Sequence, residues 1–104
     1  MTRAEINRKL LLLGLSPKHK GFHHLSEILF NMANDSLRKS PEEMIGIVSE
    51  SKRVNSRQMA SSMRYAIRYA WDVSNGEIHK VFPNYDAAPT LTEFLYVFMW
   101  ELET

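Results

Sequence analysis

The stretch NSRQMASSMRYAIRYAWDVS, Asn55–Ser74, contains neither glycine nor proline and is the longest uninterrupted helical pattern in the chain. At 100° per residue, its apolar side chains fall on one stripe and most polar side chains fall on the opposite side. The apolar stripe holds Met59, Met63, Ala66, Ile67 and Ala70, and the polar side holds Arg57, Ser61, Arg64, Tyr65 and Arg68. Twenty helical residues span roughly 30 Å, enough to cross a DNA groove while the back of the helix packs on a core. We therefore interpret this stretch as a recognition-type helix.

Length and composition indicate one soluble domain covering residues 1–104. The chain is 44% hydrophobic, which is enough to fill one modest core. It has no cysteine, so neither a disulfide framework nor a thiolate metal site can form. The leucine run at residues 10–13 stops at Gly14, far short of the roughly 20 apolar residues that a bilayer requires. We expect a cytoplasmic protein that has no contact with a membrane.

The net charge of +1 conceals a strong separation of charge along the chain. Residues 51–70 contain five basic residues and no acidic residue, and the remainder of the chain is net negative. The five are Lys52, Arg53, Arg57, Arg64 and Arg68. A charge run is commonly just a solvated face. Its concentration on the polar side of the long helix instead favours a surface that meets nucleic-acid phosphates.

Three amphipathic helices are predicted before the long one. The first runs from Thr2 to Leu13, where Thr2 and Glu5 form a capping box and Gly14 ends the helix. The second has its apolar residues at helical spacing from Phe22 and ends near Asn34. The third begins at Ser40-Pro41-Glu42-Glu43, which combines an N-cap, a proline at the first helical position and a glutamate at the third. Its expected buried residues are Met44, Ile45, Ile47 and Val48.

The third helix, a short turn at residues 51–54 and the long helix capped by Asn55 or Ser56 are the parts of a helix-turn-helix. The alternative is an ordinary helical hairpin in a bundle. After the long helix, Asn75-Gly76 predicts a stop and Glu77 to Phe82 a short helix. A last helix is predicted over residues 90–102, and it opens with a capping box of Thr90 and Glu93. The last helix is apolar nearly all round, which is typical of a helix that is fully buried or shared with a partner subunit. The expected fold is an all-α bundle of about six helices.

No catalytic or metal-binding set is recognisable in the sequence. His19 and His23 are four residues apart, but Gly21 lies between them, and no carboxylate cluster completes a ligand set. We expect a structural or surface role for these histidines, with phosphate contact by Lys18, His19 and Lys20 as the alternative. There is no nucleophile–base pair and no phosphate-binding glycine loop, so we expect neither an enzyme nor a cofactor.

Three segments carry a resemblance to a known family. The segment INRKLLLLGLSPKHKGFHHLSEILFNM at residues 6–32 has the pattern of a helix, a Gly-hydrophobic-x-Pro turn, Lys-Gly and an aromatic-led helix. MRYAIRYAW at residues 63–71 is similar to a recognition-helix core that reads Ile-Arg-His-Ala-Ile-Glu-Val-Ala-Trp, and residues 88–98 are similar to a later Pro-Thr and Glu-Phe pattern. Together, in this order, they resemble the DNA-binding effector domain of the sporulation response regulator, stage zero sporulation protein A.

The resemblance implies a six-helix domain that binds double-stranded DNA in the major groove and regulates transcription, with copies in tandem on DNA. It also implies a sigma factor of RNA polymerase as a partner. The chain departs from the family at Ala60 and Ser61, which replace a Glu-Arg pair, at Tyr65, which replaces a histidine, and in a shorter turn before the long helix. The family's receiver domain has no counterpart in this sequence, so we expect no phosphorylation control.

Roles for individual residues follow from the pattern and the resemblance together. Arg64, Ser61 and Tyr65 are expected at base edges. The expected phosphate contacts are Lys52, Arg53, Arg57, Arg68, Lys18 and Lys20. Phe94, Phe98 and Trp100 of the last helix are expected to support self-association. The alternative hypothesis is a protein-interaction module that keeps the fold but has lost specific DNA readout.

Overall fold

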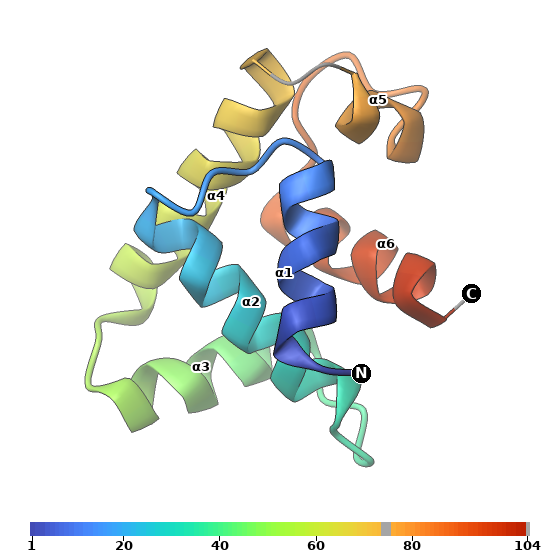
Figure 1. The fold of residues 1–104 in the computed structure, drawn as a ribbon. Coiled ribbons are helices and arrows are strands. Elements are labelled where there is room, and N and C mark those ends of the chain that lie inside the picture. The colour runs from blue at the N-terminus through green and yellow to red at the C-terminus, as the bar shows by residue number, and fades with distance from the viewer. Residues whose placement is uncertain (74–75, 104) are drawn as a thin grey trace.

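Six α-helices make up the computed structural model, which describes residues 1–73 and 76–103 (Figure 1). Within those ranges there is no β-strand. The helices are α1 (Arg3–Leu12), α2 (Lys20–Ala33), α3 (Pro41–Lys52), α4 (Ser56–Val73), α5 (Glu77–Val81) and α6 (Leu91–Glu103). The predicted all-α class and the number of helices are therefore confirmed. The predicted stop of the long helix is at Asn75-Gly76; Asn75 lies outside the described residues, and Gly76 has the predicted left-handed backbone, with a φ of 102°.

The helices begin where the capping residues of the sequence place them. In each predicted capping box the hydroxyl accepts from a backbone N–H three residues on, and the glutamate accepts from the backbone N–H of the cap. The pairs are Thr2 and Glu5, Ser40 and Glu43, and Thr90 and Glu93. The side chain of Asn55 accepts from the N–H groups of Arg57 and Gln58, so Asn55 is the cap of α4 among the two predicted candidates.

Helix α1 ends as predicted at Gly14, which has a φ of 99°. The Gly14 N–H donates to the carbonyl of Leu11, and the Leu15 N–H donates to that of Leu10. These two bonds satisfy carbonyls that the helix end leaves without partners, and they need a residue that tolerates left-handed backbone. The chain is thereby turned from α1 toward α2.

Helices α2 and α4 make the closest helix contact, and Gly21 permits it. A Cβ atom at Gly21 would lie 1.9 Å from the carbonyl oxygen of Ser62 and 2.9 Å from the Cα of Met63. Only a residue without a side chain lets the two backbones approach so closely. The apolar stripe of α4 is completely covered as a result, because Met59, Met63, Ala66, Ile67 and Ala70 are each no more than 1% exposed.

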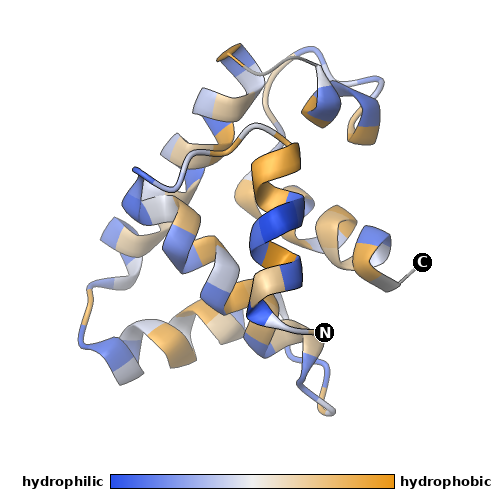
Figure 2. Ribbon diagram, in the orientation of Figure 1, coloured by the Kyte–Doolittle hydropathy of each residue, from blue (hydrophilic) through white to orange (hydrophobic). Residues whose placement is uncertain are grey.

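Helix α6 buries one side and exposes the other, although Figure 2 colours most of it in hydrophobic shades. The Phe94 ring lies 5.9 Å from the Phe82 ring and 5.7 Å from the Phe98 ring, between ring centroids. Phe94 and Phe98 are buried in the core, whereas Tyr96 is 54% exposed and Trp100 is 71% exposed. The expectation that Phe94 and Phe98 belong to a self-association surface is therefore wrong, because both rings complete the core of this chain.

Helix α3 also differs in part from the prediction. Met44 and Val48 are buried and Ile45 is half-buried, but Ile47 is exposed because it lies on the side of the helix turned away from α2 and α4. Within the described residues, no helix is both long enough and apolar enough to cross a membrane.

Candidate nucleic-acid interface

Helix α4 runs along one edge of the molecule with α2 packed against it (Figure 1). The side away from the core carries Arg57, Ser61, Arg64, Tyr65 and Arg68, and all five are exposed. The separation of α4 into a buried apolar stripe and an exposed polar side is thus confirmed. Because the back of the helix packs on the core, these side chains are presented together on its outward side.

Three arginines on this side have no acidic partner. In the part of the chain that the structure describes, the ion pairs are Lys39–Asp35, Lys52–Glu27 and Lys80–Glu77. Arg57, Arg64 and Arg68 take part in none of them. Their guanidinium groups can reach an external anion without first breaking an internal ion pair. We refer to these three residues as the arginine face.

Lys52 is less available than the sequence suggested. Its Nζ lies 3.0 Å from a carboxylate oxygen of Glu27 on α2, so this pair ties the end of α3 to α2. Arg53 follows with left-handed backbone at a φ of 57°, and its side chain is exposed. Burial, and after it the charge of Lys52, lowers the pKa of nearby His24, so this ring adds no charge at neutral pH. Arg53 is therefore the more accessible cation of the α3–α4 turn.

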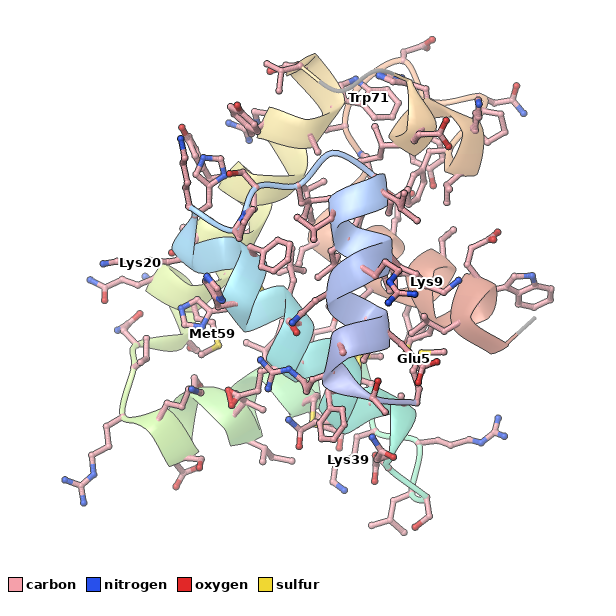
Figure 3. All side chains as sticks on the ribbon, in the orientation of Figure 1. Glu5, Lys9, Lys20, Lys39, Met59 and Trp71 are labelled. Atoms are coloured by element: carbon pink, nitrogen blue, oxygen red, sulfur yellow. The ribbon has the colours of Figure 1, made fainter. Side chains whose placement is uncertain are left out.

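A second basic element lies beside α4 although it is distant in sequence. Lys18 and Lys20 are both exposed, and Lys20 extends away from the fold (Figure 3). A groove separates them from α4, with residues 18–21 on one side and Ser61, Ser62 and Tyr65 on the other. We call residues 17–20 the basic arm. The structure thus brings together two sets of predicted phosphate contacts that the sequence alone left unrelated.

The aromatic residues of α4 join the arm to the helix. The ring of His19 meets Tyr65 and Tyr69 edge to face, with centroid distances of 5.0 and 4.6 Å. Tyr65 was predicted at base edges, and this contact engages one side of its ring while leaving it 57% exposed. Tyr69 was not singled out from the sequence. Its position four residues after Tyr65, on the same side of the helix, was the available signal.

The opposite flank of α4 carries charges of both signs. One groove there is bounded by Arg64, Arg68, Asp72 and Asp86, and a neighbouring one is bounded by Arg57, Ser61, Arg64 and Glu42. A bond from its own backbone N–H, followed by one from the Thr92 hydroxyl, lowers the pKa of Glu42. The carboxylate therefore stays ionised in mildly acidic solution. The carboxylates on this flank offset the arginines beside them, whereas the groove on the arm side has no carboxylate in its lining.

The remaining histidines are engaged in local contacts. His23 Nε2 donates to the carbonyl of Pro17 at 2.8 Å, and His79 lies against Trp71 with ring centroids 3.8 Å apart. Figure 3 shows Trp71 between α4 and α5. These contacts agree with the structural role predicted for the histidines. Among the described residues, no group of three or more His, Cys, Asp or Glu side chains is arranged to hold a metal ion.

Neither a protein-family model nor a curated protein matches this chain. The fold and the surface define an all-helical chain in which one helix, packed on the core, presents three arginines beside a basic arm, and these arginines form no ion pair with any described residue.

Proposed function

We propose that this chain binds double-stranded DNA by placing the outward side of α4 in the major groove. The observation that carries the proposal is the arginine face: three exposed guanidinium groups without acidic partners in the described chain, on a helix whose other side is completely buried. An α-helix with side chains is about 10–12 Å wide, and the major groove is about 12 Å wide. Helix α4 is thus of a size and charge that suit the groove.

The connection to α3 supports a helix-turn-helix mode of binding. Residues 53–55 join the end of α3 to the start of α4, and α3 packs against α4 as the first helix of such a motif does. A helical hairpin in a bundle has the same connection but does not need an unpaired basic side. The charge on α4 therefore favours the DNA-binding interpretation.

Roles can be assigned by position on this surface. Arg64 lies in the middle of the arginine face, where a guanidinium can donate two hydrogen bonds to guanine O6 and N7, and Ser61 lies one turn before it. Arg57 and Arg68 lie nearer the two ends of the helix, and with Arg53 they suit phosphates. Tyr65 can contact a base only at the edge of this surface, because its ring packs against His19. Lys18 and Lys20 add phosphate contacts from the arm.

By its resemblance, we further propose that the chain is a cytoplasmic transcription regulator of the sporulation effector type. Tandem copies and a sigma factor are the partners that this type implies. Of the three aromatic residues expected to support self-association, only Trp100 is exposed, and Tyr96 accompanies it. We expect weak self-association that a tandem DNA site promotes.

Duplex binding measured over a range of salt concentrations tests this function. Each phosphate contact contributes about 0.9 to the slope of log affinity against log salt, so several contacts give a steep dependence. Selection of bound sites from random duplexes should then return a consensus. A flat salt response would contradict DNA binding, and steep binding without a consensus would contradict sequence-specific readout.

The second candidate is a protein-interaction module. The exposed aromatic side of α6 favours it, because Trp100 and Tyr96 are large side chains that a monomer usually covers. In this case duplex binding would be weak and Trp100→Ala would abolish association with the partner. Sedimentation of the chain with and without a tandem duplex distinguishes the two candidates.

A further inference from the structure

We propose that His19 is a positioning residue: it fixes the basic arm against α4, so that Lys18 and Lys20 hold the phosphates along one wall of the groove that α4 enters. This inference rests on the proposed function. In this role His19 touches neither base nor phosphate, but it sets the strength of binding to any duplex.

Packing, rather than hydrogen bonding, holds the ring of His19. The ring lies edge to face with Tyr65 and Tyr69, and its Nδ1 atom is buried without a hydrogen-bond partner among the described residues. The contacts with the two tyrosines are therefore what keep the ring in this place. A loop residue is thus joined to α4 at two successive turns of its exposed side.

Further contacts hold the arm on α2 and on its own loop. His23 donates to the carbonyl of Pro17, and the backbone N–H of Lys18 donates to the hydroxyl of Ser16. Immediately after the arm, the backbone of Gly21 lies against that of Ser62. The arm is therefore held at both ends, with His19 in the middle. The lysine side chains on either side of His19 remain exposed and form no ion pair within the described residues.

The position of the arm matches one wall of the major groove. A helix that nearly fills the groove has a row of phosphates along each side. On the side of Tyr65, the lining of the groove beside α4 includes Lys18 and Lys20 and no acidic residue, whereas on the other side Asp72 and Asp86 lie beside the arginines. The side of α4 next to the arm is thus the side that suits phosphates. Because it is already ordered, binding incurs little of the entropy loss that a flexible basic loop would incur.

A set of variants tests whether His19 acts through the lysines. The wild type, His19→Ala, the pair Lys18→Ala and Lys20→Ala, and the triple variant are titrated with a duplex of random sequence at several salt concentrations. The lysine pair should lose about two contacts, each about 0.9 in the log–log slope. His19→Ala should lose part of the same slope and weaken binding several-fold. The triple variant should bind no more weakly than the lysine pair.

Three further variants separate positioning from general stability. His19→Phe keeps the edge-to-face contacts and should restore the slope. Tyr69→Ala removes the other side of the contact and should reproduce His19→Ala, which provides a second measurement if the alanine at His19 melts below the assay temperature. His79→Ala replaces a histidine of α5 that packs on Trp71, far from the arm, and should leave the slope unchanged.

Two results would overturn the inference alone. The first is a triple variant whose loss of affinity equals the sum of the losses for His19→Ala and for the lysine pair. The second is a salt slope for His19→Ala equal to that of the wild type. Absence of salt-dependent duplex binding by the wild type would overturn the proposed function and this inference with it. The two failures are distinguishable because the first two results require normal binding by the wild type.

Discussion

Helices α4 and α6 both present large side chains to solvent, but they differ in how clearly the two sides of each helix are separated. Helix α4 has apolar residues on one side and cations on the other, and burial follows this division closely. Helix α6 carries aromatic and aliphatic residues nearly all round, yet it is covered on one side only. Charge on one side of a helix decides which side is buried, because an unpaired cation is expensive to remove from water. Where aromatic residues lie on every side of a helix, the packing of the neighbouring helices determines which side is buried.

The largest effect is expected at Gly21, where α2 supports α4. Gly21→Ala places a methyl group 1.9 Å from a backbone oxygen of Ser62, and neither backbone can move without opening the core. We expect a loss of about 3 kcal/mol or more in the free energy of unfolding, at or above the upper end for overpacked sites.

Gly46→Ala on α3 is the matched control, since no atom lies within 4 Å of its Cβ position. It should leave stability unchanged or raise it by about 0.5–1 kcal/mol. Equal melting temperatures for the two variants would show that α2 and α4 are not in close contact.

Each of these two helices carries one tryptophan, and the burial of the two side chains differs. Trp71 is half-buried against the core and against His79, whereas Trp100 is 71% exposed. Trp71→Ala should cost about 2–4 kcal/mol, somewhat less than a fully buried tryptophan, and Trp100→Ala should cost less than about 0.5 kcal/mol. Chemical denaturation of both variants measures the difference. A large loss at Trp100 would mean that the outward side of α6 is covered in solution, by another copy or by another segment.

Two variants should distinguish the recognition of bases from the general attraction to phosphates. Arg64→Ala should lose about 1–3 kcal/mol on the preferred site and little on scrambled DNA, because a guanidinium at a base edge specifies sequence. Lys52→Ala should weaken all duplexes alike, and by less than a full contact, because Glu27 already shares its charge. Titrations of both variants on the two duplexes provide the measurement. Equal losses for Arg64→Ala on both would mean that this arginine holds phosphate only.

The smallest effect concerns the start of α6 and depends on pH. The backbone N–H of Thr90, then its hydroxyl, then Tyr85 lower the pKa of Glu93. A lowered pKa in the folded state means that the stabilisation is present above the ordinary pKa of glutamate and is lost as the pH falls through the folded value. Glu93→Gln should therefore flatten the fall in melting temperature between about pH 5 and pH 3. Glu50→Gln, at an exposed site beyond the first turn of α3, serves as the control. Identical pH curves for wild type and Glu93→Gln would show that this cap does not contribute to stability.

The sequence by itself determined the features that depend on near neighbours in the chain. The three capping boxes and the stop at Gly14 were predicted because each involves residues within a few positions of one another. The buried stripe and the arginine face of α4 were predicted because helical periodicity alone separates them. The six helices and the cationic side of α4 could therefore be read before any tertiary contact was known.

Only the tertiary structure decided which distant residues share a surface. The basic arm lies beside Tyr65 and Tyr69 because Gly21 lets α2 cross α4 closely, and more than forty positions separate these residues in the sequence. The pairing of Lys52 with Glu27 and the burial of Phe94 and Phe98 likewise depend on how whole helices pack. Periodicity sets the side of a helix on which a residue lies. The close packing of helices in three dimensions sets what that side meets.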